Sequence, residues 1–321
     1  MCTANSSTSS VSATCRWSPS TTSSPSRRPP EVDVDRRRFL TVLSAGLFVS
    51  ACASRPGVPV ASPGSVAAPS MAPAPAARQG RAPAGVDRGA LVARFEGVPA
   101  TQWGTHLPGV VTHVSAGGPG RPLALTFDGC GGPAGSGVDH ALLDLLERER
   151  IPATLFLNRR WIDAHPDLVR DLAAHPLFEV ENHGSRHLPL SVHGRSAYGI
   201  DGTGSSAEVV DEVLDNHERI RTLTGREPHW FRAGTAHYDE VAVDIVGEIG
   251  VRIAGFAVNG DGGATFGAGQ VRASLLGAES GAIVLLHLNH PQGGTAEGLE
   301  AALPELRASG THFVLLEQGR D

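Results

Sequence analysis

At residues 123–132 the chain reads Leu-Ala-Leu-Thr-Phe-Asp-Gly-Cys-Gly-Gly. The run before Asp128 predicts a buried strand, and the glycines after it predict a turn where that strand ends. Asp before Gly commonly starts a turn, which is the simpler explanation of this carboxylate. A carboxylate that closes a buried strand also stands where parallel α/β folds place functional side chains. We therefore expect Asp128 to belong to a site.

Outward from this strand, apolar runs alternate with helical patterns to the end of the chain. The expected strands are 122–128, 153–158, 178–181, 229–232, 252–258, 282–287 and 312–316. The expected helices are 139–150, 166–174, 207–223, 239–249, 270–277 and 295–309. Such alternation is typical of repeated βα units with parallel strands. The sequence predicts an α/β fold, a (β/α) barrel, in one domain at 89–321.

Polar residues whose side chains could take part in catalysis or metal binding lie at the carboxyl ends of the expected strands. They are Asp128, His183, Arg232, Asp261 and His287. In barrels the active site lies at this end, because the strand ends converge there and the loops above are free to vary. We expect the five side chains to meet at one face. A structural ion pair for Arg232 and a core position for His287 are the alternatives.

A pair of histidines, His183 and His187, lies four residues apart on one of these strand-end loops. On a helical turn, imidazoles at this spacing share one face and can bind one metal ion. Two histidines alone also occur at surfaces and in cores. Their position opposite a candidate carboxylate favours a metal site.

These motifs resemble those of the polysaccharide deacetylase family, the NodB-homology or carbohydrate esterase family 4 enzymes. The family's Thr-Phe-Asp-Asp-Gly and His-Ser/Thr-x-x-His motifs are similar to residues 126–130 and 183–187. Its arginine motif and its Leu-x-His motif are similar to residues 231–234 and 285–287. The resemblance covers about 119–318 in the family order. It implies a distorted (β/α) barrel of the NodB-homology type.

The resemblance also implies catalytic roles. Asp128 stands where the family has its catalytic base, and His287 where it has the acid that protonates the leaving nitrogen. Arg232 would hold and polarise Asp128, with Asp261 as a further partner. His183 and His187 would bind a divalent metal, for which we expect zinc.

This sequence departs from the family at the residue that completes the metal site. Gly129 replaces the metal-binding Asp, and the fourth-motif Trp is absent. Gly184 and Ala233 also replace family residues. We expect Asp128 to be drawn onto the metal as the third ligand, with Cys130 or water as alternatives. Asp128 would then be a shared base, or Glu181 or Asp139 would take the proton, although Asp139 fits better as a helix cap.

The implied activity is hydrolysis of a non-peptide amide. We expect a metal-activated water to remove N-acetyl groups from a cell-wall polysaccharide, either peptidoglycan or a chitin-like glycan. An O-acetyl esterase or a cyclic-amide hydrolase is the alternative, because ester and amide hydrolysis use the same apparatus. The missing motif Asp leaves a third reading, an inactive glycan-binding module. The sequence specifies neither the glycan nor the oligomeric state.

The N-terminal segment predicts export. Residues 1–51 are a Ser/Thr/Pro-rich leader followed by three arginines at 36–38 and a short apolar run, the layout of a twin-arginine signal. The run ends at Cys52 in a stretch that resembles a bacterial lipobox. Residues 52–88 are an Ala/Pro-rich spacer. We therefore expect an extracytoplasmic lipoprotein, anchored to the cell membrane at Cys52.

Composition excludes several classes of function. Every basic residue in the 321-residue chain is Arg, which excludes a Schiff-base lysine and a phosphate-loop lysine. Removal of residues 1–51 takes away 6 Arg and 3 acidic residues, and so changes the formal charge from −6 to −9. A nucleic-acid partner is not expected at this charge. Cys2 and Cys15 precede the cut, so Cys130 is left without a disulfide framework.

Overall fold

The computed structural model describes residues 85–115 and 120–316. The expected leader at 1–51 lies outside these residues, as does the spacer up to residue 84. The export signal, the anchor at Cys52 and the domain boundaries therefore stay predictions. Within the described residues, no helix is long and apolar enough to cross a membrane.

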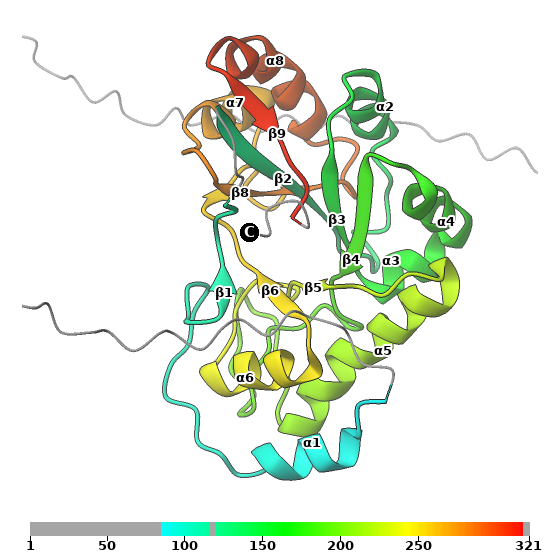
Figure 1. Ribbon diagram of the computed structural model, residues 1–321, viewed down its shortest axis with the longest axis vertical. Coiled ribbons are helices and arrows are strands. Elements are labelled where there is room, and N and C mark those ends of the chain that lie inside the picture. The colour runs from blue at the N-terminus through cyan, green and yellow to red at the C-terminus, as the bar shows by residue number, and fades with distance from the viewer. Residues whose placement is uncertain (1–84, 116–119, 317–321) are drawn as a thin grey trace, which may run out of the picture. The chain divides into compact units, whose positions relative to one another are not determined.

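The strands of the described chain form one parallel sheet that curls into a barrel (Figure 1). Their order is β1-β6-β5-β4-β3-β2-β8-β7, and β9 pairs with β2. The bounds are β1 Val110–Val111, β2 Arg121–Gly129, β3 Ala153–Leu157, β4 Phe178–Asn182, β5 Trp230–Phe231, β6 Arg252–Ala254, β7 Val258–Asn259, β8 Ile283–His287 and β9 Thr311–Phe313.

Backbone hydrogen bonds between the segment after β1 and the start of β8 close the ring. The Ile283 amide donates to the Thr112 carbonyl at 3.0 Å, and the Val114 amide donates to the Gly281 carbonyl at 2.7 Å. These bonds join the chain after β1, the first strand in the order, to β8, the strand next to the other end. The (β/α) barrel expected from the sequence is therefore confirmed.

Helices connect the strands and cover the outside of the barrel (Figure 1). Their bounds are α1 Arg88–Phe95, α2 His140–Arg148, α3 Arg159–Ala164, α4 Pro166–Ala174, α5 Ser206–Thr224, α6 Glu240–Ile249, α7 Ala268–Leu276 and α8 Thr295–Ala308. Helices α4 and α5 pack against β4, and α6 packs against β6. The Asp139 carboxylate accepts a hydrogen bond from the Leu142 amide at 3.0 Å, so Asp139 caps α2 as expected.

Strand β2 is buried on both faces. Its side chains point alternately to the two faces, and this alternation determines on which face the site lies. Leu125 and Phe127 pack in the core cluster that includes residues of α2, α7 and α8. Ala124 belongs instead to a cluster with Phe156 and other strand residues from around the ring, which fills the barrel interior. Because successive strand residues point to opposite faces, Asp128 lies on the interior face with Ala124.

The structure differs from the sequence expectation at residues 252–258. The single strand expected there is two strands, β6 paired with β1 and β5, and β7 paired with β8. The Arg232 guanidinium bonds the carbonyls of Ala254 and Gly255, so these groups do not continue the β6 ladder. Helix α3, six residues long, was not expected because it is too short to show helical periodicity.

Candidate active site

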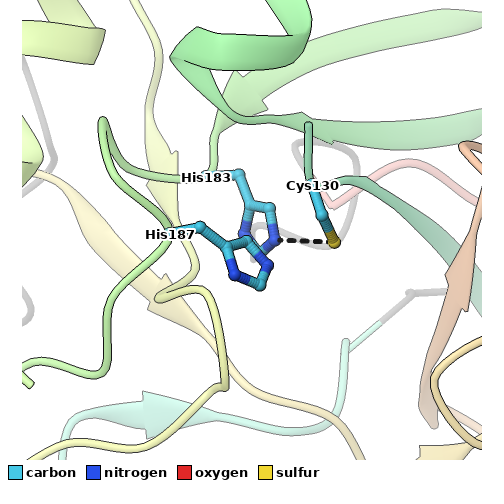
Figure 2. A group of neighbouring side chains, drawn as sticks. All are labelled: Cys130, His183 and His187. Carbon is cyan, nitrogen blue, oxygen red and sulfur yellow. Dashed lines mark hydrogen bonds between the residues drawn. The ribbon is translucent and has the colours of Figure 1, made fainter. Parts of the chain in front are cut away.

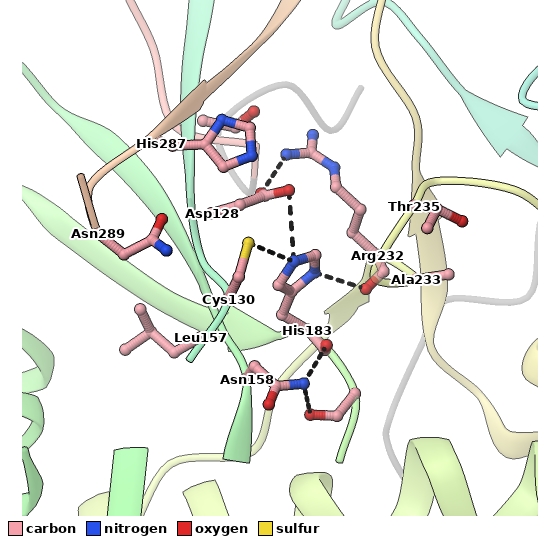
Figure 3. Close-up of polar contacts among 12 residues, drawn as sticks. Asp128, Cys130, Leu157, Asn158, His183, Arg232, Ala233, Thr235, His287 and Asn289 are labelled. Atoms are coloured by element: carbon pink, nitrogen blue, oxygen red, sulfur yellow. Dashed lines mark hydrogen bonds and ion pairs between the residues drawn. The ribbon is translucent and has the colours of Figure 1, made fainter. Parts of the chain in front are cut away.

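Asp128 and Arg232 form a buried ion pair at the carboxyl ends of β2 and β5. The Arg232 Nη1 donates to Asp128 Oδ1 at 2.8 Å, and both side chains are buried (Figure 3). The guanidinium also donates to the carbonyls of Ala254 and Gly255, and it stacks over the Phe156 ring at 4.3 Å. Arg232 is therefore fixed on all sides and holds the Asp128 carboxylate in one orientation.

His183 follows β4 and presents one ring nitrogen to the site. Its Nδ1 lies 2.9 Å from the Arg232 carbonyl oxygen, a contact that places the proton on Nδ1. Its Nε2 lies 3.5 Å from Asp128 Oδ2 and 3.8 Å from Cys130 Sγ (Figure 3). Burial lowers the pKa of His183, but the Asp128 carboxylate and Cys130 outweigh burial and leave the pKa above its ordinary value. A histidine held by a hydrogen bond at one ring nitrogen can present the other to a metal ion, which displaces the proton there.

His187 is held beside His183 by an unusual backbone conformation. Its φ is 66°, in the left-handed region that most residues other than glycine avoid. The two rings lie 4.9 Å apart between centroids. The buried Glu212 carboxylate accepts hydrogen bonds from the amides of Arg186 and Leu188, on both sides of His187. The Nε2 of His187 is buried without a hydrogen-bond partner, which is uncommon for a buried polar atom and leaves this nitrogen available to a ligand.

Cys130 lies directly after β2 and faces the two histidines (Figure 2). Within the described residues, one group of three metal-ligating side chains is found, formed by Cys130, His183 and His187. Their ligand atoms lie within 4.8 Å of one another. Asp128 is next to this group but is not a member of it.

His287 ends β8 and forms a second carboxylate–imidazole pair with Asp261. Its Nδ1 lies 2.9 Å from Asp261 Oδ1, and its backbone amide donates to Asp261 Oδ2 at 2.7 Å. The Thr295 hydroxyl also donates to Oδ2, at 3.0 Å. Asp261 therefore contacts His287, and not Arg232 as the sequence suggested, because β7 pairs with β8 and brings residue 261 beside residue 287.

Burial and neighbouring charges shift the pKa values of Asp128 and His287 in opposite directions. Burial raises the pKa of Asp128, but the charges of His183 and Arg232 outweigh it and leave the pKa below its ordinary value. Burial lowers the pKa of His287, yet the Asp261 carboxylate and Cys130 outweigh burial and raise the pKa well above its ordinary value. At neutral pH the site therefore holds an ionised carboxylate and a protonated imidazole.

The pKa of the Cys130 thiol is shifted as well. Burial raises it, but hydrogen bonds from His183, His187 and His287 outweigh burial and hold the pKa well below its usual range. The thiol therefore has a strong tendency to ionise among three imidazoles.

Several residues that shape the site carry no clear signal in the sequence. The Asn158 amide donates to the carbonyl oxygens of His183 at 3.0 Å and Gly184 at 2.7 Å, and so fixes the turn that presents the histidines (Figure 3). Glu212 supports the same loop from α5. Glu181, considered above as a base, accepts bonds from the amides of His229 and Trp230, so its carboxylate supports the backbone.

Trp103 contacts two residues that have no role assigned above. Its ring contacts His237 at 5.7 Å, and the Arg195 guanidinium lies over it at 5.2 Å. The exposed Tyr198 ring also contacts His237, with 5.2 Å between the ring centroids. Trp103 therefore forms an aromatic group with His237 and Arg195.

Comparison with known proteins places the chain in a family. The model of the polysaccharide deacetylase family matches residues 116–254. A chitooligosaccharide deacetylase from Bradyrhizobium sp. (strain ANU 289) is 30% identical over 175 residues, which are 54% of this chain and 73% of that protein. The chain belongs to the polysaccharide deacetylase family.

Other members of the polysaccharide deacetylase family share less of their length with it. Peptidoglycan-N-acetylglucosamine deacetylase PgdA of Listeria monocytogenes is 30% identical over 200 residues, 62% of this chain but 38% of the relative. The chain therefore spans well under half of that relative. BA3943, a carbohydrate esterase family 4 pseudoenzyme from Bacillus anthracis, has a similar structure, with a TM-score of 0.53 and 20% identity over 63% of this chain and 66% of that one. At this identity the likeness concerns the fold alone.

Proposed function

We propose that this protein is a metal-dependent hydrolase that removes N-acetyl groups from a cell-wall polysaccharide, either peptidoglycan or a chitin-like glycan. The proposal rests on one observation: Asp128, whose pKa is lowered, His287, whose pKa is raised, and the neighbouring imidazoles of His183 and His187 meet at one end of the barrel. The names of the Listeria and Bradyrhizobium relatives support N-acetylated glycans as the substrate class.

The residues present fit a divalent metal, and zinc suits their chemistry. His187 has a buried Nε2 without a partner, and His183 is held with its Nε2 facing the site. These two histidines would bind the metal. When bound, the metal supplies Lewis acidity, which polarises an acetamide carbonyl and lowers the pKa of water.

The protein's own groups supply the proton transfers. Asp128, kept ionised beside Arg232, accepts a proton from the attacking water. His287, kept protonated by Asp261, donates a proton to the nitrogen as the carbon–nitrogen bond breaks. The products are acetate and a free amino sugar. This substrate lies outside the cytoplasm, in agreement with the export signal and the Cys52 anchor that we expect.

An acetate-release assay on the full chain tests this function. We expect acetate from oligomers of N-acetylglucosamine, and little or none from acetylated xylan. Release from the xylan alone would instead support the esterase alternative. No release from either substrate by a metal-loaded, folded protein would support a glycan-binding module.

Asp261→Asn is expected to shift the pH dependence of kcat/KM. His287 acts as an acid, so activity is present below its pKa and is lost as pH rises through it. Because Asp261 raises the His287 pKa, removal of its charge lowers that pKa and moves the alkaline limb to lower pH. Thr295→Val is the matched control, since it removes one hydrogen bond to Asp261 and keeps the charge. An unchanged alkaline limb in Asp261→Asn would contradict the acid role of His287.

A further inference from the structure

Position 129, where the family has its metal-binding Asp, faces away from the histidines in this chain. A Cβ at Gly129 would lie 3.0 Å from Leu157 Cδ2, 3.4 Å from Trp161 and 3.5 Å from Leu288. All three of these side chains are fully buried and apolar. A carboxylate at position 129 would therefore be buried in the core between the sheet and α3, at a high free-energy cost.

Position 130 continues the interior face of β2. Residues 128 and 130 point to the same side of an extended strand, so Cys130 follows Asp128 toward the barrel interior. Its Sγ lies 3.8 Å from His183 Nε2 (Figure 2). The turn after it is fixed, because Gly131 has a φ of 69° and a Cβ there would lie 2.6 Å from the Trp161 amide nitrogen.

Asp128 is already engaged elsewhere. Its Oδ1 accepts the hydrogen bond from Arg232, which is itself bonded to two backbone carbonyls and so keeps the carboxylate in place. Its Oδ2 lies 3.5 Å from His183 Nε2, but the ligand atoms that lie within 4.8 Å of one another belong to Cys130, His183 and His187 and not to Asp128. Asp128 is therefore held beside the group of possible ligands, whereas Cys130 is part of it.

We propose that Cys130 is the third protein ligand of the metal, so that a thiolate and two imidazoles hold it and Asp128 serves as the base alone. This inference rests on the metal-dependent function proposed above, and it replaces Asp128, the ligand that the sequence favoured. Binding releases the thiol proton to solvent. Three protein ligands leave a fourth position open, as in catalytic zinc sites, and the thiolate favours zinc over magnesium or manganese.

Cobalt substitution tests the ligand directly, without reference to activity. The full chain loaded with Co²⁺ is expected to show the near-ultraviolet absorption of a thiolate–cobalt bond. Cys130→Ser should lose this band and weaken zinc binding by roughly 100-fold or more, beyond the loss typical of an outer-shell partner. A chain with Cys2, Cys15 and Cys52 all changed to Ser is the matched control, and it should keep both the band and the affinity.

Carboxylate variants separate a ligand role from a folding defect. Cys130→Asp is expected to bind zinc far more tightly than Cys130→Ser but to show no thiolate band. Adding Gly129→Asp to Cys130→Ser should restore no zinc binding, because that carboxylate points at Leu157 and Trp161.

Two results of these measurements would contradict the assignment of Cys130. A band that persists in Cys130→Ser, or zinc affinity that falls in Asp128→Asn and not in Cys130→Ser, would overturn Cys130 as ligand and leave the metal-dependent function standing. A folded wild-type protein that binds neither metal would overturn both proposals.

Discussion

Asp128→Asn is expected to lower kcat by about three orders of magnitude while zinc remains bound. The amide has nearly the shape of the carboxylate and can still accept the hydrogen bond from Arg232 Nη1, but it cannot take a proton from water. A general base contributes about 10²–10⁴-fold to the rate, which sets the size of the loss. Steady-state kinetics and metal analysis of the same preparation measure both quantities.

The Asn variant also leaves the buried Arg232 charge without a counter-charge, so a lower melting temperature is expected. Kinetics are therefore compared well below that temperature, with circular dichroism to verify folding. Loss of zinc in proportion to activity would show that Asp128 is a metal ligand. Full retention of kcat would remove it from the mechanism.

His183→Ala is expected to abolish stoichiometric metal binding, and His187→Ala to do the same, whereas His287→Ala keeps the metal and loses turnover. A ligand contributes to affinity, while an acid contributes to the transition state. Metal content after dialysis against zinc-free buffer separates the two roles. His290→Ala is the matched control, because His290 lies next to His287, at 6.5 Å between ring centroids, and has no assigned role. Equal loss of metal from all the site variants would mean that His287 is misassigned.

The fold could be predicted because the periodicity of the chain is strong. Strand β2 and helices α4 and α5 lie within one residue of their expected bounds, since each has a clear apolar pattern or a capping signal at its ends. Strand 252–258 was predicted wrongly as one element. The interruption comes from Arg232, which donates hydrogen bonds to the backbone carbonyls of Ala254 and Gly255, 22 and 23 positions away. A local sequence pattern does not indicate such a contact.

The position of the site could be predicted from the sequence, but the contacts between its side chains were harder to predict. Carboxyl ends of parallel strands converge, which is why Asp128, His183, Arg232 and His287 lie together as expected. The partner of Asp261 depends on the pairing of β7 with β8, a register that sequence alone does not fix. Alternation already put residues 128 and 130 on one side of β2. The sequence did not show that Arg232 holds the Asp128 carboxylate in an ion pair, beside the Cys130 and histidine side chains.

Zinc titration of the metal-free protein tests the central claim most directly. Full-length protein is stripped of metal, and acetate release from N-acetylglucosamine oligomers is followed as zinc is added. The account predicts no activity without metal, a linear rise, and a plateau at one equivalent of zinc per chain. Activity that persists in the stripped protein, or a protein that binds one equivalent of zinc and releases no acetate, would contradict it.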